Sequence, residues 1–126
     1  MNLPIFRAKK KDSDEYVIGF YSVAYDIHHY IVTHLGVDTK VDVVYQMSTD
    51  IHKIDPTTLS ISFPDMLDSQ GNRIFASLSE DGKGGDIVEY NGGQEIIKYS
   101  NGTIQTYMFR FEDLKELNFK GIGIKE

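Results

Sequence analysis

The sequence predicts a mainly β protein, built as a small antiparallel barrel or a strongly bent sheet with one or two short helical turns. Three observations support this fold class. Apolar and polar residues alternate along many short segments, which is the period of a β-strand. Gly, Asn and Pro separate these segments, and Asn-Gly pairs at 91–92 and 101–102 supply the positive φ angles of tight hairpin turns. Segments with helical spacing are few and short, which favours sheets over layered helices.

The N-terminal half is expected to form a series of hairpins. Residues 4–8 (PIFRA) and 15–23 (EYVIGFYSV) are rich in strand-forming side chains, and the charged run 9–14 between them has the composition of a turn. Residues 25–35 (YDIHHYIVTHL) fit a strand, although a short helix over about residues 26–35 fits nearly as well. A turn at 37–40, a strand at 41–46, a return strand at 50–54 and a short strand at 58–62 follow.

The last third carries the strongest local signals. Segments 87–90, 94–100 and 103–111, joined by the two Asn-Gly turns, predict three sequential antiparallel strands. Residues 111–117 (FEDLKEL) predict one or two helical turns that direct Phe111, Leu114 and Leu117 toward the core, and residues 119–124 (FKGIGI) predict a final strand.

Composition indicates one β-rich domain spanning residues 1–126. The chain has no Cys, which excludes disulfides and thiolate metal sites. Its net charge of -6 repels a phosphate backbone, so nucleic-acid binding is not expected from the average surface. We find no secretory signal pattern and no run near the ~20 apolar residues of a membrane span, so we expect a cytoplasmic protein that does not enter a membrane.

No residue cluster identifies a reaction, and we expect no cofactor, no metal and no catalytic residue. The segment 81–86 (DGKGGD) resembles a phosphate-binding loop but lacks the spacing and the following helix of a P-loop. Acidic turns at 12–15 and 79–82 lack the alternate ligand spacing of a calcium loop. His28 with His34, or His29 with His52 if their strands pair, offer two imidazoles without a third ligand. Whether an enzyme is encoded stays open, with the balance against it.

Three stretches carry a further pattern. The first is a Phe-Arg-Ala strand, a polar turn and a Tyr-Val-x-Gly-Phe strand, formed by Phe6, Arg7, Ala8, Tyr16, Val17, Gly19 and Phe20. The second is an Asp-Pro-x-Thr-Leu segment followed by an Asp-x-x-Gly-x-x-Ile-Phe turn, formed by Asp55, Pro56, Thr58, Leu59, Asp68, Gly71, Ile74 and Phe75. The third is Gly85, Asp86, Ile87 and Val88. In this order, and over about half of the chain, they resemble the YopX family of phage and prophage proteins.

The resemblance implies a β-rich fold that includes an SH3-like barrel, expected within about residues 56–126 with the N-terminal strands as candidates to complete it. It also implies a phage or prophage origin in a bacterial host cell and no established activity. The matched residues are expected to be structural. Residues 76–84 (ASLSEDGKG) depart from the family pattern, and we interpret them as an insertion that forms a mobile surface loop.

Three functions stay open. The first is a non-enzymatic interaction module that binds an unknown protein partner or a second copy through a strand edge or through an aromatic surface of Tyr21, Tyr25, Tyr30, Tyr90, Tyr99 and Tyr107. The second is an accessory protein of phage DNA metabolism, with nucleic-acid contacts from Arg7, Lys9, Lys10, Lys11 and Lys83. The third, the least favoured, is a metal-dependent enzyme built on His28, His34 and nearby carboxylates.

Overall fold

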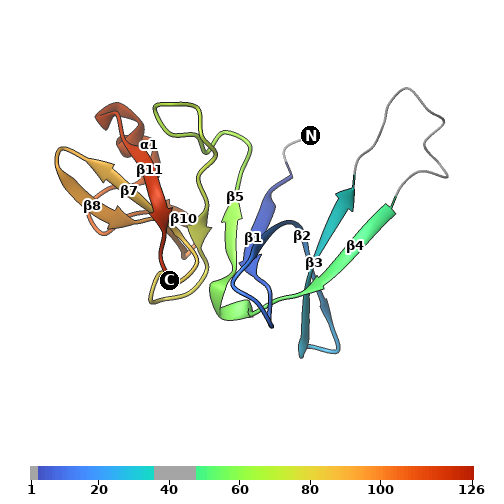
Figure 1. The fold of residues 1–126 in the computed structure, drawn as a ribbon. Coiled ribbons are helices and arrows are strands. Elements are labelled where there is room, and N and C mark those ends of the chain that lie inside the picture. The colour runs from blue at the N-terminus through green and yellow to red at the C-terminus, as the bar shows by residue number, and fades with distance from the viewer. Residues whose placement is uncertain (1–2, 36–47) are drawn as a thin grey trace, which may run out of the picture.

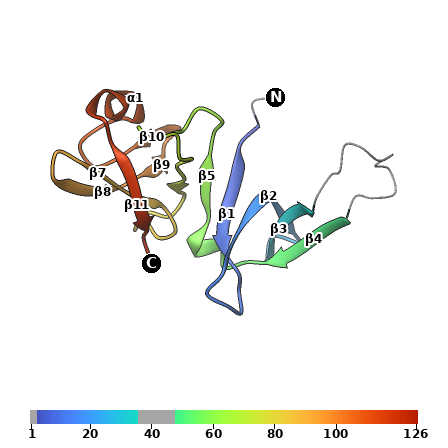
Figure 2. The same ribbon diagram turned by 45° about the horizontal axis from the view of Figure 1, so that its top comes forward.

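The computed structural model describes residues 3–35 and 48–126, and over these ranges the protein is mainly β. Two sheets account for the strands: an eight-stranded sheet with the order β10-β9-β6-β5-β1-β2-β3-β4 and a three-stranded sheet with the order β11-β7-β8. In Figures 1 and 2, β7, β8, β11 and α1 gather at one end, β2, β3 and β4 lie at the other, and β1 and β5 lie between them.

The large sheet consists, in spatial order, of β10 (Thr103–Gln105), β9 (Lys98–Ser100), β6 (Ala76–Ser77), β5 (Ser60–Ser62), β1 (Ile5–Lys9), β2 (Tyr16–Ala24), β3 (His28–Leu35) and β4 (Ser48–Lys53). The small sheet consists of β11 (Lys120–Ile124), β7 (Asp86–Tyr90) and β8 (Gly93–Ile96). The helical turns are η2 (Pro56–Thr58), α1 (Phe111–Leu114) and η3 (Lys115–Leu117).

Most locally encoded elements lie where the sequence predicts them. β1 and β2 pair antiparallel, and β7–β8 and β9–β10 form the two hairpins with Asn-Gly turns. At these turns Asn91 and Asn101 adopt φ of 50° and 53°, and the following glycines are also positive. Phe111 and Leu114 of the helical turns are buried and Leu117 is partly buried, as expected. The predicted turn 37–40 and strand 41–46 lie outside the described residues.

Residues 28–35 form a strand, so the alternative helix is wrong. Ile31 is fully buried, while His29 and Thr33 on the same face are partly exposed. Tyr25 and Asp26 make the preceding turn with φ of 56° and 61°, and the Ile27 N–H donates to the Ala24 carbonyl at 3.3 Å. A β-turn with two positive φ angles matches the twist of a hairpin, which explains why β2 and β3 pair directly.

The three sequential strands expected in the last third do not form one sheet, because the chain changes sheets at Ile97. The Ile97 N–H donates to the Asp86 carbonyl in the small sheet at 3.0 Å, and its carbonyl accepts from the Ser77 N–H of the large sheet at 2.9 Å. β8 therefore pairs with β7, whereas β9 pairs with β10 and, in parallel, with β6. Over the described residues, the expected barrel is not found, since the two sheets stay open and β4 and β10 are the opposite edges of the larger one.

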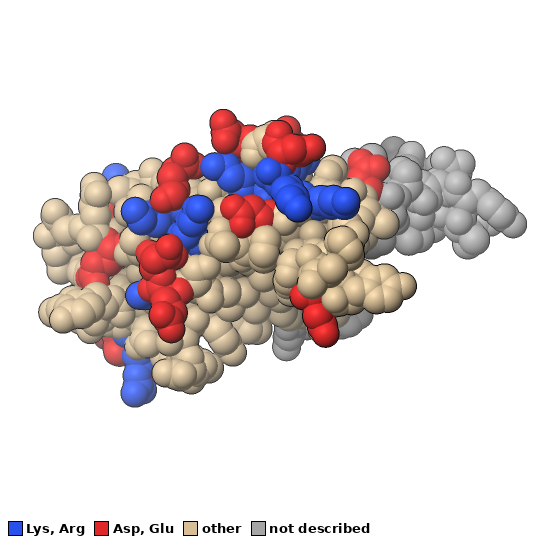
Figure 3. Space-filling view, turned by 90° about the horizontal axis from the view of Figure 1, so that it is seen from below, with Lys and Arg blue, Asp and Glu red and all other residues tan. Residues whose placement is uncertain are grey.

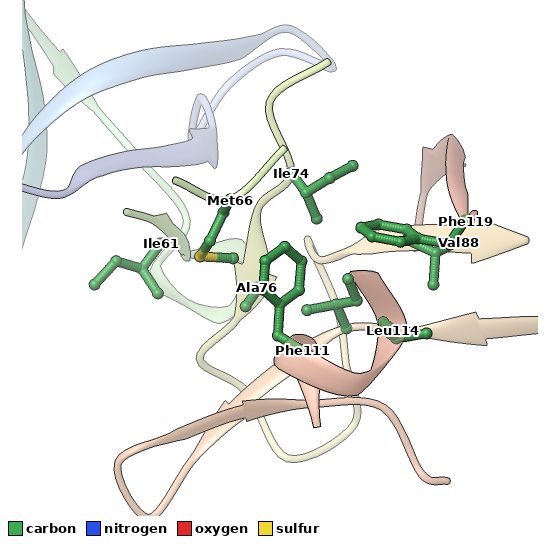
Figure 4. Packing of buried hydrophobic residues seen from close by; sticks show 9 residues of the cluster. Ile61, Met66, Ile74, Ala76, Val88, Phe111, Leu114 and Phe119 are labelled. Atoms are coloured by element: carbon green, nitrogen blue, oxygen red, sulfur yellow. The ribbon is translucent and has the colours of Figure 1, made fainter. Parts of the chain in front are cut away.

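Two apolar clusters hold these sheets together. The larger, shown in Figure 4, contains Ile61, Met66, Ile74, Ala76, Val88, Ile97, Phe111, Leu114 and Phe119. Phe111 and Phe119 meet edge to face with ring centroids 5.6 Å apart, an arrangement that the quadrupoles of the two aromatic rings favour. The smaller cluster contains Ala8, Val17, Ile31, Ile54 and Leu59. Phe6 packs against both clusters, so β1 joins the two halves of the core.

Candidate functional site

Residues from all three family-like stretches meet in one buried cluster, which we call the Arg7 clamp (Arg7, Phe75, Gly84 and Asp86). The Arg7 guanidinium donates from Nη2 to Asp86 Oδ1 at 2.8 Å and to the Gly84 carbonyl at 2.9 Å. It also lies 4.6 Å from the centroid of the Phe75 ring. The second carboxylate oxygen of Asp86 accepts from the Phe75 N–H at 2.7 Å. The clamp therefore ties β1 of the large sheet to β7 of the small one.

The environment of the Arg7 clamp is poor in water. Arg7 is 8% exposed and Asp86 is 7% exposed. Burial raises the pKa of the Asp86 carboxyl, and the Arg7 charge and the Phe75 N–H offset that effect only in part. Arg7 Nε and the Tyr16 hydroxyl are buried without a hydrogen-bond partner among the described residues. Burial likewise raises the pKa of Tyr16. This geometry fastens the two sheets to each other.

The Asp-Pro-x-Thr segment fastens η2 to β1. Asp55 caps η2 by accepting from the Thr57 N–H at 3.0 Å, and Pro56 supplies the fixed φ of the first helical position. The Thr58 hydroxyl donates to the Asp55 carbonyl at 2.7 Å and accepts from the Lys9 N–H at 2.8 Å. The hydrogen bond from the Thr57 hydroxyl lowers the pKa of Asp55. These contacts make the segment a structural corner.

The Asp-x-x-Gly turn fastens β11. Asp68 accepts from the N–H groups of Gln70 and Asn72 at 3.0 and 2.8 Å, and from the Gly121 N–H at 3.0 Å. Gly71, with φ of 82°, closes the turn in a conformation that favours glycine. Burial acts to raise the pKa of Asp68, but the three N–H donors outweigh it and the pKa is lowered. These contacts fix the turn against β11.

We expect the stability of the fold to fall in acid in part through Asp68. A carboxyl whose folded pKa is lowered contributes stability above its ordinary pKa and loses that stability as the pH falls through the folded pKa. Asp68→Asn should lower the free energy of unfolding at neutral pH by about 1–3 kcal/mol, because an NH2 group replaces one carboxylate oxygen and cannot accept the N–H bonds made to that oxygen. It should also flatten the acid limb of a plot of unfolding free energy against pH.

Denaturant titrations at a series of pH values measure both effects. Asp113→Asn, at an exposed position in α1, controls for the change in net charge. Burial raises the pKa of Asp86, so the contribution of Asp86 to stability changes with pH in the opposite direction to that of Asp68. The contribution of Asp68 is therefore the difference in unfolding free energy between wild type and Asp68→Asn at each pH. Parallel curves for these two proteins would contradict the assignment.

The remaining matched residues serve packing. Gly19 lets β2 approach β3, since a Cβ there would lie 2.2 Å from the Val32 carbonyl oxygen. Ile74 and Val88 are buried in the larger cluster, and Ile87, on the other face of β7, is partly exposed. Gly85 lies against Ser77 and the Ile97 carbonyl, where no side chain fits. The family-like residues are therefore brought together as a framework.

The segment 76–84 is only in part the surface loop that the sequence suggests, since Leu78, Glu80 and Asp81 are exposed but both ends are buried. Ala76 and Ser77 form β6 and are fully buried, and Gly82 and Gly84 are also buried. The Ser77 hydroxyl donates to the Lys83 carbonyl at 2.8 Å. The Gly84 N–H donates to the Lys125 carbonyl at 2.8 Å. The segment supplies a strand and the Gly84 carbonyl of the Arg7 clamp, which explains its length.

His29 and His52 do not assemble a metal centre with a third ligand among the described side chains, and the His34 side chain of the other predicted pair lies outside them. β3 and β4 pair so that Ile31 lies opposite His52, which places His29 and His52 on one face and His28 on the other. The His29 Nδ1 atom is engaged with the Tyr21 hydroxyl at 2.5 Å. Among the side chains that the structure describes, no group of three or more His, Asp or Glu is arranged to hold a metal ion.

The expected nucleic-acid contacts are largely neutralised. Arg7 is buried in the clamp, which corrects its assignment as a surface contact. Lys9 pairs with Asp14 at 3.5 Å and Lys10 with Glu15 at 3.0 Å, as the alternating charges predict. Figure 3 shows Lys and Arg side chains lying among Asp and Glu over this face of the molecule.

The tyrosines do not form one aromatic surface. Tyr25 and Tyr107 are 89% and 93% exposed and lie in separate turns, while the other four are partly buried. Tyr90 packs edge to face on Phe109, and Tyr99 packs on Phe63. Tyr21, Tyr90 and Tyr99 therefore pack against the core clusters.

The outer edge of β4 is a candidate site that sequence reasoning did not locate. The Ile54 N–H donates to the His29 carbonyl at 3.1 Å, and the ladder alternates, so residues 50 and 52 face β3 while the N–H and C=O of Ile51 point away from it. Among the described residues, no strand pairs with this edge. The Ile51 side chain is 65% exposed. Lys53 marks the end of the open stretch, because its carbonyl accepts from the Lys11 N–H at 3.0 Å.

Comparisons with known proteins give no assignment: no family model, no curated protein and no solved structure matches the chain significantly. Within the described ranges, no helix is long and apolar enough to cross a membrane.

Proposed function

We propose that this chain is a YopX-like phage or prophage protein that acts as a non-enzymatic, self-assembling module, in which two copies join through the open edge of β4. The order of the three family-like stretches and the convergence of their residues on one framework support the family. An SH3-like arrangement of about residues 56–126 belongs to the same proposal, and the pairing of β5 with β1 supports a contribution from the N-terminal strands.

The observation that carries the proposed assembly is the outward N–H and C=O of Ile51. An unpaired strand edge is a template for another strand, and soluble proteins usually protect it with charge, proline or a bulge. Here the position at the centre of the open stretch is an exposed isoleucine. Two antiparallel copies centred on Ile51 would exchange a pair of backbone hydrogen bonds at the two-fold axis.

Side-chain charge favours this register. When Ile51 lies opposite the same residue of a second copy, Asp50 lies opposite His52 on each side, and the two isoleucines meet between these pairs. A register centred one residue earlier would instead oppose Asp50 to itself, and like charges directly across strands are destabilising. The edge is therefore self-complementary in one register, which is what a two-fold interface requires.

Light scattering coupled to size-exclusion chromatography tests the assembly. We expect the wild-type protein to dimerise as its concentration rises, and Ile51→Lys to remain monomeric, because lysine on an edge blocks pairing. Ile27→Lys makes the same change at an equally apolar and exposed turn position, and this variant should dimerise like wild type. A wild type that stays monomeric at every concentration would contradict the proposal, as would equal effects of the two lysine variants.

A charge exchange tests the register. Asp50→His alone opposes histidine to histidine and should weaken the dimer, whereas the double variant Asp50→His with His52→Asp restores opposite partners and should recover it. If the double variant does not dimerise while Ile51→Lys stays monomeric, assembly through the β4 edge would still hold, but the register centred on Ile51 would be wrong.

A further inference from the structure

We infer that the Arg73 guanidinium binds a carboxylate group in a small hollow between the two sheets, a site separate from the β4 edge. The hollow has a volume of about 200 Å³ and is lined by Asn72, Arg73, Gly121 and Gly123, with the Arg7–Asp86 pair also in its wall. That volume accommodates a small acid or the end of a chain.

Arg73 is held in place without an ion-pair partner. Its Nε donates to the Ser62 hydroxyl at 2.9 Å and its Nη2 to the Ser62 carbonyl at 3.2 Å. Among the described residues no carboxylate lies within ion-pair distance of it, whereas Arg7 pairs with Asp86 and Arg110 with Glu112. Ser62 occupies two of the five guanidinium N–H groups, so three remain to donate. Arg73 is therefore a partly buried cation that neutral groups hold in place, with N–H groups free to donate to an external anion.

The neighbouring acids are already occupied. Asp86 accepts from Arg7 and from the Phe75 N–H. Asp68 accepts from the N–H groups of Gln70, Asn72 and Gly121 and from the Asn72 amide. Neither carboxylate lies within ion-pair distance of Arg73. Of the two arginines that line the hollow, Arg7 is therefore paired and Arg73 is not.

These acids also select the ligand. Two carboxylates close by would repel a phosphate dianion more strongly than a monoanion. The planar fork of arginine matches a carboxylate with two parallel hydrogen bonds. The chemistry therefore favours a monocarboxylate, whose source is either a free small acid or the C-terminus of a peptide.

The backbone of β11 forms part of the wall of the hollow. The pairing of β11 with β7 shifts register between Gly121 and Gly123, so a bulge faces the hollow. Bulges disrupt the ladder and are common beside binding sites. A Cβ at Gly121 would lie 2.9 Å from the Ile74 Cδ1 atom, so Ile74 would have to shift to admit a side chain. Gly121 and Gly123 carry no side chains, so the β11 part of the wall is backbone.

Nuclear magnetic resonance titration of the full chain tests the site with three probes: acetate, an N-acetylated dipeptide with a free C-terminus, and the same dipeptide amidated. We expect saturable shifts of the Arg73 Nε–H and of the Asn72 and Gly123 amides with a carboxylate probe, and none with the amide. Saturation by acetate assigns a free acid as the ligand source, and saturation by the dipeptide alone assigns a chain terminus.

Three variants make the test specific. Arg73→Gln should abolish binding, and Arg73→Lys, which keeps the charge and loses the fork, should weaken it at least about tenfold. Arg110→Gln removes the same charge from an exposed site and should bind like wild type. Should Arg73→Gln fail to fold, the lysine variant decides. Shifts that never saturate, or equal affinity in the lysine variant and wild type, would overturn the inference.

Discussion

Replacing Arg7 with methionine is expected to lower the free energy of unfolding by about 3–5 kcal/mol, the usual cost of removing one partner of a buried ion pair. The variant leaves the Asp86 carboxylate in an apolar environment and the Gly84 carbonyl without its donor. It also removes the guanidinium from the Phe75 ring. Urea denaturation followed by circular dichroism gives the free energy directly.

A double-mutant cycle separates the ion pair from other effects. Asp86→Asn alone should also destabilise, and the double variant with Arg7→Met should lose less than the sum of the two, because each single change leaves the other group unpaired. Lys120→Met, which removes a partly exposed ion pair with Glu89 at 3.8 Å, is the surface control and should cost less than about 1 kcal/mol. Strictly additive losses at Arg7 and Asp86 would contradict the coupling.

Gly84→Ala is expected to be the most damaging single methyl addition, with a loss of about 4 kcal/mol or more in unfolding free energy or a failure to fold. A Cβ at this position would lie 1.9 Å from the Thr58 carbonyl oxygen, and the φ of 82° already disfavours alanine. Backbone atoms surround the new methyl group, so relief requires η2 and the 76–84 segment to separate.

Gly92→Ala is the matched control for that substitution. Gly92 has φ of 79° but no atom within 4 Å of the position a Cβ would take. Its substitution carries only the cost of a left-handed alanine, about 1–2 kcal/mol. Thermal denaturation of both variants compares the two losses of stability. Similar losses would contradict the close contact between Gly84 and the Thr58 carbonyl.

Local chemistry explains which elements sequence reasoning recovered. Neighbouring residues determine the two Asn-Gly hairpins, the β1–β2 hairpin and the helical turns after Arg110. These elements can therefore be predicted from the local sequence. The split of residues 94–100 at Ile97 depends instead on Ser77, which belongs to the other sheet and is separated from Ile97 by the whole β7–β8 hairpin. No period or turn residue marks it. Whether the sheets close depends likewise on contacts between distant segments, and over the described residues they stay open.

The site shows the same division. The Asp55 cap and the Asp68 turn bond residues within a few positions, so their structural role could be anticipated. The Arg7–Asp86 pair joins residues 79 positions apart, and no local pattern around either residue predicts its partner. The open edge of β4 follows only from strand order and register, because every strand in a meander has the same pattern whether or not a neighbour covers it.

Residue-resolved amide exchange at increasing protein concentration tests the proposed assembly most directly. Within β4, the His52 N–H faces β3 and the Ile51 N–H faces outward, so one chain carries its own control. We predict that protection of the Ile51 amide rises with concentration, while that of His52 is high throughout. An Ile51 amide that exchanges fast at every concentration would contradict assembly through this edge.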